Sequence, residues 1–239
     1  MGRAFQNRKE SMLKTSIAKA KVYSRAGREI YVCAKAGGPD PETNAMLKGL
    51  IDRAKRDQVP TSVIDRAIEK ATGGGGEDYA AAYYEGYGPG GTMVIVECLT
   101  DNPTRTFNEV RHTWGKGKGK MGNAGSVSHM FDHCGILRFA GKTEDEVLES
   151  LLEADVDVTN VEDEDSMITV FVPNTEYHKA KTALAESFGA LDFDVDEIQF
   201  LAQNPVQLTE QEDIDAFTKF LEMIEELDDV QKVFHSAEL

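Results

Sequence analysis

A run of four glycines, Gly73 to Gly76, divides the chain into two parts with different hydrophobic patterns. Before the run, apolar residues recur at intervals of three and four, as in amphipathic helices. After it, runs such as "TMVIVECLT" (92–100) have the length and composition of β-strands and alternate with helical segments. Because consecutive glycines form a flexible linker, we place a domain boundary there.

The part before the glycines predicts a head of three helices. In the first, apolar residues between positions 23 and 33 recur at helical spacing. Asp40 is expected to cap a second helix whose first residue is Pro41. Ser62 and Asp65 are expected to form a capping box at the start of the third.

The part after the glycines predicts an α+β fold. Its segments follow the order β-α-β, then β-α-β-β-α-β, then α-β, with "SVSHMF" and "GILRFA" as two short strands around "DHCG". This order favours antiparallel sheets with helices on one face, and so two ferredoxin-like domains. The last helix and strand are expected to return and complete the first of them. The predicted domains are 1–76, 77–134 together with 203–239, and 135–202.

The net charge of −16 is unevenly distributed along the chain. Residues 1–72 carry a net charge of +7, residues 73–139 carry −1 and residues 140–239 carry −22. A basic head attracts the phosphates of a nucleic acid and an acidic tail repels them, so the head is expected to dock. Acidic surface explains the solubility of the tail but not the charge of the head.

Several other features bear on location. No apolar run approaches the roughly 18 residues that span a bilayer. The first residues lack the apolar segment of a secretory signal. Three scattered cysteines favour a reducing compartment over a disulfide scaffold. We expect a cytoplasmic monomer with no membrane partner.

The stretch "TWGKGKGKMGNAGS" (113–126) combines glycine and lysine as phosphate-binding loops do. Gly117 and Gly122 have the Walker spacing, but Asn123 and Ala124 follow where Lys and Ser or Thr are needed. Phosphate loops also run from a strand into a helix, and here a helix comes first. The stretch is therefore not expected to bind a mononucleotide.

The same stretch carries Lys116, Lys118 and Lys120 on alternate residues. Glycine lets the backbone approach a ligand closely, and the three ammonium groups repel one another unless a polyanion or solvent screens them. Two interpretations stay open: a mobile finger that contacts phosphates, or a solvated connection.

A second basic candidate lies in the head. Lys14, Lys21, Arg25 and Arg28 would share one stripe if their segment is a single helix, which suits a phosphate backbone. A merely solvated basic face is the alternative.

Two tyrosines flank a tight turn in "YEGYGPGG". Tyr84 and Tyr87 could stack on unpaired bases, although a structural turn with packed tyrosines fits equally well. The remaining candidates for contact with nucleic acid are Arg53, Lys55, Arg105 and Arg111.

No catalytic or metal-binding constellation stands out. His129, His133 and Cys134 suggest a metal site, but no second Cys/His cluster completes a tetrahedral set. No nucleophile, base and oxyanion hole come together in a recognisable motif. We expect no enzyme activity, no metal, no cofactor and no small-molecule substrate.

Segments along nearly the whole chain resemble a known family. They include "AKAGGPDPETN", "VPTSVIDRAIEKATGG", "YEGYGPGGTMVIVECLTDN", "RTFNEVR", "GNAGSVSHMFDHCGIL" and "LDDVQKVFH". These segments are similar to the YebC/PmpR family of transcriptional regulators, whose mitochondrial relatives are translational activators. The resemblance implies three domains with a discontinuous middle domain, no enzyme activity and a cytoplasmic location. The start "MGR" and the segment "VPTSVID" look more like the YeeN-type branch, and "GRAFQ" replaces the family's usual "GHSKW".

The sequence as a whole predicts a non-enzymatic regulator of gene expression that binds nucleic acid. Promoter DNA and ribosomal RNA, with association with the ribosome, are both open as targets. A basic helical head suits duplex DNA, whereas glycine-rich loops with tyrosines favour folded or single-stranded RNA, and the balance favours RNA. The alternative is a protein-interaction adaptor that acts through its acidic C-terminal surface.

Overall fold

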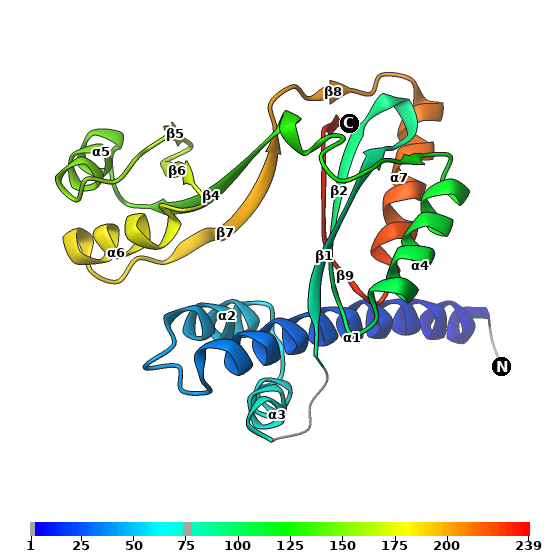
Figure 1. The fold of residues 1–239 in the computed structure, drawn as a ribbon, viewed down its shortest axis with the longest axis horizontal. Helices are drawn as coiled ribbons and strands as arrows, with labels where there is room; N and C mark the ends of the chain where they lie inside the picture. Colours follow the sequence, from blue (N-terminus) through cyan, green and yellow to red (C-terminus); the bar gives the residue numbers. More distant parts are fainter. Residues whose placement is uncertain (1–2, 74–77) are drawn as a thin grey trace. The chain divides into compact units, whose positions relative to one another are not determined.

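The computed structural model describes residues 3–73 and 78–239, with side chains from residue 19 onward (Figure 1). Most of the predicted glycine linker therefore lies outside the described residues. The chain divides into two compact units, one of residues 1–83, 97–112 and 223–232, the other of residues 84–96, 113–222 and 233–239. The α+β class, with an N-terminal helical region and two antiparallel-sheet domains, is confirmed. The predicted boundaries of the three domains stay a prediction.

The head contains the three expected helices, α1 (Arg3–Gly37), α2 (Ala45–Arg56) and α3 (Thr61–Thr72). Their apolar stripes meet in one core, because residues three and four apart share a helix face. Ile30 of α1, Leu47 and Ile51 of α2, and Ile64 of α3 are buried there.

The expected caps of the second and third helices are wrong. Asn44, not Asp40, caps α2, and its side chain accepts a hydrogen bond from the N–H of Leu47 at 3.1 Å. The same buried amide donates to the carbonyls of Cys33 and Gly38, at 3.3 and 2.9 Å. This contact with α1 favours the later start, since Asn44 satisfies groups of both helices. The N-cap position of α3, Pro60, makes no side-chain cap, so the predicted capping box is absent there.

The first sheet has the strand order β3-β1-β2-β9. Its strands are β1 (Ala80–Tyr87), β2 (Met93–Thr100), β3 (Lys120–Met121) and β9 (Val230–His235). Helix α4 (Pro103–Lys116) follows β2, and α7 (Gln211–Glu225) precedes β9. Because β9 lies beside β2, the C-terminal segment returns to the first sheet, as expected. Two short parallel strands, β8 (Val206–Gln207) and β10 (Ala237–Glu238), pair with each other.

The second sheet has the strand order β5-β6-β4-β7, and each neighbouring pair is antiparallel. Helices follow its first and third strands, which is the βαββαβ order of ferredoxin-like domains. Their apolar faces share one core with the sheet. The elements are β4 (Phe131–Ala140), α5 (Glu144–Glu153), β5 (Asn160–Glu164), β6 (Met167–Pro173), α6 (Tyr177–Phe188) and β7 (Phe193–Ala202).

The two short strands expected around "DHCG" are instead one continuous strand, β4, preceded by a single helical turn at Ser128–Met130. Gly135, which follows Cys134 within this strand, is needed for close packing. A Cβ atom there would lie 2.6 Å from the ring of Tyr177. The aromatic ring of α6 therefore lies directly on the backbone of β4.

Two adjacent leucines of α5 test the assignment of the inner face. Leu151 is fully buried, whereas Leu152 is 68% exposed. Leu151→Ala should lower the free energy of unfolding by about 2–5 kcal/mol, because it removes apolar contacts and leaves a cavity. Leu152→Ala is the matched control and should change it by less than about 0.5 kcal/mol. Equal losses in chemical denaturation would contradict the assigned faces.

Candidate nucleic-acid interface

The lysine segment, defined as Lys116, Lys118 and Lys120, is not the open loop that its glycines suggested. Lys116 is the last residue of α4, and Lys120 begins the short strand β3. Between them Lys118 adopts a left-handed conformation, with φ of 62°, and its N–H donates to the carbonyl of Gly115 at 3.1 Å. The segment is thus the C-terminal turn of a helix that leads directly into a strand.

A buried tryptophan fixes this turn. Trp114 is fully buried, and its indole N–H donates to the backbone carbonyl of Tyr87 on β1 at 2.9 Å. A Cβ atom on Gly119 would lie 2.6 Å from the tryptophan ring, and one on Gly86 would lie 2.4 Å from the carbonyl oxygen of Lys120. Glycine is therefore needed at both positions for the close approach of β1 and β3.

A buried carboxylate fixes the chain that follows. Glu85 is 8% exposed and accepts hydrogen bonds from the N–H groups of Gly125, Val127 and Ser128, at 3.0, 3.0 and 2.9 Å. Burial alone would raise the pKa of Glu85, but the three N–H groups outweigh it and hold the pKa below its ordinary value. The carboxylate thus stays ionised and anchors residues 125–128.

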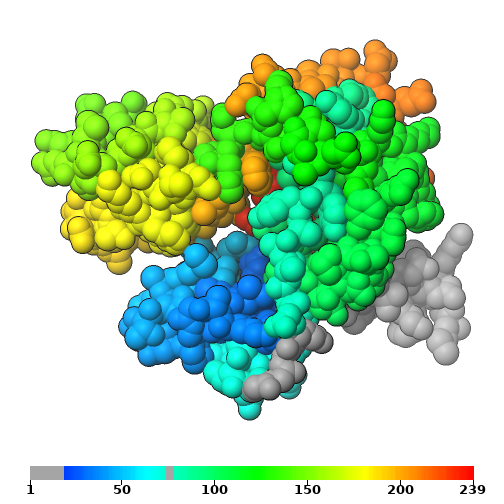
Figure 2. Space-filling model, in the orientation of Figure 1, coloured from blue at the N-terminus to red at the C-terminus, as the bar shows by residue number. Residues whose placement is uncertain are grey.

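These anchors leave the lysine segment at the surface. All three lysines are exposed, and none of them forms an ion pair among the residues that the structure describes. Lys120 lies directly opposite Tyr87 in the β1–β3 pairing, so the two side chains lie on the same face of the sheet. Tyr87 is 45% exposed. In the space-filling view, the green part, which includes α4 and the residues after it, is visible at the surface of the face shown (Figure 2).

The basic stripe of the head, in contrast, is in contact with its own chain. Lys21 donates to the carbonyl of Glu226 at 3.3 Å, and Arg25 to that of Glu225 at 2.8 Å. Arg28 donates to the carbonyl of Asp228 at 2.6 Å. The segment is one helix, as the stripe required, but the side chain of the fourth member, Lys14, lies outside the described residues.

Asp229 is a second buried carboxylate with several partners. It is 5% exposed, and its Oδ2 accepts hydrogen bonds from Thr100, Arg105 and Thr106, at 3.1, 2.8 and 2.7 Å. Its Oδ1 lies 3.2 Å from Arg28 Nη1. Burial would raise the pKa of Asp229, but Arg105 and the two threonines outweigh it and lower the pKa. Arg105 is thus used within the chain, and it also pairs with Asp101 at 2.7 Å.

The other candidates are dispersed. Arg53 lies 3.6 Å from Glu29, and Lys55 pairs with Asp52 one helical turn away, at 3.7 Å. Tyr84 is half-buried on β1, and Arg111 is exposed on α4. These residues therefore lie on several different elements, and a role in binding stays a prediction for each of them.

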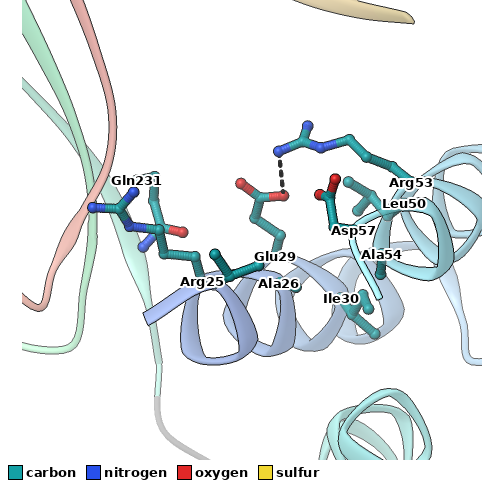
Figure 3. Close-up of a pocket in the computed structure, with 10 residues that line it drawn as sticks. Arg25, Ala26, Glu29, Ile30, Leu50, Arg53, Ala54, Asp57 and Gln231 are labelled. Carbon is teal, nitrogen blue, oxygen red and sulfur yellow. Dashed lines mark ion pairs between the residues drawn. The ribbon is translucent and has the colours of Figure 1, made fainter. Parts of the chain in front are cut away.

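A cavity of about 180 Å³ lies between α1, α2 and the start of β9 (Figure 3). Arg25, Arg53, Glu29 and Asp57 line it, so charges of both signs face the same space. The side-chain oxygen of Gln231, another lining residue, is buried without a hydrogen-bond partner in the structure. The dashed contact in Figure 3 joins Arg53 to Glu29, so two of these four charged side chains pair with each other.

The histidines and cysteines do not gather into a metal site in the described part of the chain. The ring of His133 stacks on Phe200, with centroids 4.2 Å apart, and burial lowers the pKa of this histidine. All three cysteines are buried, and burial raises the pKa of Cys134 to about 11. Within residues 3–73 and 78–239, no helix is long and apolar enough to cross a membrane.

Sequence reasoning missed the residues that organise these surfaces, namely Glu85, Trp114 and Asp229. Glu85 and Asp229 lie in the quoted segments "YEGYGPGG" and "LDDVQKVFH", and the single tryptophan of the chain adjoins the lysine segment. The position of the single tryptophan beside several glycines is the sequence signal that could have identified Trp114. The partners of the two carboxylates are more than 35 residues away, which local patterns do not reveal.

Glu85→Gln tests the carboxylate anchor. The amide cannot accept three N–H bonds as a carboxylate does, so the free energy of unfolding at pH 7 should fall by about 1.5–3 kcal/mol. Because the pKa of Glu85 is lowered in the folded state, its stabilisation is complete above the unfolded value of about 4.3 and is lost as the pH falls through the folded value.

The difference between wild type and Glu85→Gln should therefore narrow in acid, measured by denaturant unfolding at several pH values. Glu109→Gln, at an exposed position of α4, is the control and should have little effect at any pH. A difference that persists unchanged in strong acid would show that the charge of Glu85 is not what anchors residues 125–128.

Comparison with known proteins places this fold in a family. Residues 3–74 match the family model of the TACO1/YebC protein N-terminal domain, and residues 79–237 match that of the TACO1/YebC second and third domain. Relatives from Chromohalobacter salexigens and Hydrogenovibrio crunogenus are each 64% identical over 239 residues. The match covers 100% of this chain and 99% or 100% of the relative, and both are named "Probable transcriptional regulatory protein".

A solved structure, that of a conserved hypothetical protein from Aquifex aeolicus, has a similar fold. It superposes with a TM-score of 0.74 at 34% identity, over 92% of this chain and 90% of that one. Together with the two family models, which cover almost the entire sequence, this shows that the chain belongs to the TACO1/YebC family.

Proposed function

We propose that this chain is a non-enzymatic regulator of gene expression that binds nucleic acid through the lysine segment and Tyr87. It acts as a cytoplasmic monomer without a cofactor or small-molecule substrate. The names of its relatives, "Probable transcriptional regulatory protein", support a regulatory role. Nucleic acid is the partner to which a cluster of exposed lysines beside an aromatic ring is chemically suited.

One observation carries this proposal: the lysine segment is basic, exposed and without an ion pair to any described side chain, while most other basic candidates contact their own chain. Free ammonium groups release condensed counterions when they meet phosphates, which drives binding. Trp114 and Glu85 hold the backbone on both sides of the segment. The lysines are therefore presented in a fixed arrangement, which lowers the entropy lost on binding.

The position of Tyr87 favours RNA over duplex DNA. Its ring is nearly half exposed and lies on the sheet face of Lys120, so a base could stack on the ring while its phosphate meets the ammonium group. Bases in a duplex are already stacked, whereas the loops of a folded RNA offer unpaired bases. We therefore propose ribosomal RNA as the target, with promoter DNA as the alternative that experiment must separate.

Replacement of Lys116, Lys118 and Lys120 by Ala should weaken binding to RNA and reduce its salt dependence. Each lost phosphate contact lowers the slope of log K against log salt by roughly 0.7–0.9, so the slope should fall by about 2 to 3. Fluorescence anisotropy at several salt concentrations measures this. The fold should persist, because the three side chains are exposed.

The matched control replaces three lysines elsewhere, Lys48, Lys142 and Lys219, and so removes the same charge. If the slope of log K against log salt falls equally in both triple variants, the effect comes from net charge alone. That result would contradict binding at the lysine segment. Salt-independent capture of a protein partner, with no nucleic acid retained, would favour the adaptor instead.

Tyr87→Ala should weaken association with ribosomes about 10-fold or more, since a stacked base contributes roughly 1–3 kcal/mol and 1.4 kcal/mol is a factor of ten. Binding to duplex DNA should barely change. Tyr87→Phe keeps the ring and should bind ribosomes like wild type. Co-sedimentation with ribosomes and binding to a promoter fragment are the two measurements. A footprint on one promoter without co-sedimentation at low salt would reverse the preference for RNA.

A further inference from the structure

The basic stripe of α1 contacts a single short stretch of the same chain. Lys21, Arg25 and Arg28 lie at positions i, i+4 and i+7 and so share one face of the helix. Their donors reach the backbone carbonyls of Glu226, Glu225 and Asp228, respectively. We call residues 225–229 the cover segment. All these residues belong to the same compact unit.

The cover segment offers the stripe what a nucleic-acid backbone would offer. The last carbonyls of a helix have no partner within it and carry partial negative charge, and α7 ends at Glu225. Glu225, Glu226 and Asp228 add exposed carboxylates beside these carbonyls. The cover segment is therefore negatively charged and presents a row of oxygen acceptors. Lysine and arginine bind phosphodiester oxygens through the same donors.

We propose that Lys21 and Arg25 form a second phosphate-binding surface, which the cover segment occupies until a nucleic-acid backbone displaces it. This inference rests on the proposed function and adds its regulation. The lysine segment, which forms no ion pair with the side chains that the structure describes, makes the first contact. The stripe adds its contacts only after its bonds to the carbonyls of residues 225 and 226 are exchanged for bonds to phosphates.

The contacts differ in how readily they exchange. The bonds of Lys21 and Arg25 are exposed to solvent, so water and salt weaken them. The ion pair between Arg28 and Asp229 is partly buried, with side chains 17% and 6% exposed, and Asp229 is further held by three other donors. Exchange at Lys21 and Arg25 therefore leaves the Arg28–Asp229 contact in place.

A double-mutant cycle on the full chain tests the proposal. One arm removes the stripe donors with Lys21→Ala and Arg25→Ala. The other arm neutralises the cover segment with Glu225→Gln, Glu226→Gln and Asp228→Asn, which keeps the backbone and the shape of the exposed side chains. Affinity and salt slope are measured for each protein with poly-uridylate RNA and with a random-sequence DNA duplex. Unfolding curves establish that all variants are folded.

In the wild-type background the stripe substitutions should change affinity by less than about 2-fold, because each bond to a phosphate replaces a bond to the cover segment, whose carboxylates also repel the phosphates. In the neutralised background the same substitutions should weaken binding about 10-fold and lower the salt slope by roughly 1.4 to 1.8, as expected for two phosphate contacts. The two effects are thus strongly non-additive.

The matched control neutralises three consecutive exposed carboxylates in β5, with Glu162→Gln, Asp163→Asn and Glu164→Gln. This changes net charge by the same amount, and the stripe substitutions should remain without effect in that background. Additive effects in the cover-segment cycle, with salt-dependent binding still lost on removal of the lysine segment, would overturn this inference alone. No binding of either probe by the wild-type protein at low salt would overturn the proposed function as well.

Discussion

The buried carboxylate of Asp229 joins the separate parts of one compact unit. It accepts hydrogen bonds from β2 through Thr100 and from α4 through Arg105 and Thr106, and it pairs with Arg28 of α1. A carboxylate buried without partners would cost several kcal/mol, and the loss of any one element removes part of the compensation. One contact of α1 within this unit is thus made to a side chain about 200 residues away in sequence.

A related arrangement holds the other unit, where Glu85 gathers backbone N–H groups and Trp114 bonds to the backbone of β1. The two carboxylates explain why similar basic residues have different surroundings. Near Asp229 and the cover segment, positive side chains are satisfied by the chain itself. Glu85, in contrast, accepts its hydrogen bonds from backbone N–H groups and forms no ion pair with the lysine segment. The three lysines therefore face solvent. Basic composition alone does not identify a binding surface, and the surface that we propose rests on the distribution of internal partners.

Much of the fold follows from hydrophobic periodicity. The helices of the head, the strand β2 and the βαββαβ order of residues 131–202 are all visible as local patterns. The start of α2 is not, because Asp40 and Asn44 are both good caps and the choice depends on contacts of Asn44 with α1. Strand β3 is also missed, since two residues cannot show alternation. The residues of the basic stripe lie on one helix, but the partners of Lys21, Arg25 and Arg28 at 225–229 are distant in sequence and could not be inferred.

Strand β3 also bears on whether the protein forms intermolecular β-sheet at high concentration. It is the outer strand of its sheet, and an uncovered outer strand invites pairing with another chain. Here the pairing ends after two residues, and the N–H of Gly122 is taken up by the carbonyl of Glu85 at 2.7 Å. A short outer strand that begins with a charged lysine is a poor template for intermolecular β-sheet. Lys120, which we propose as a phosphate contact, thus also disfavours pairing of this edge with another chain.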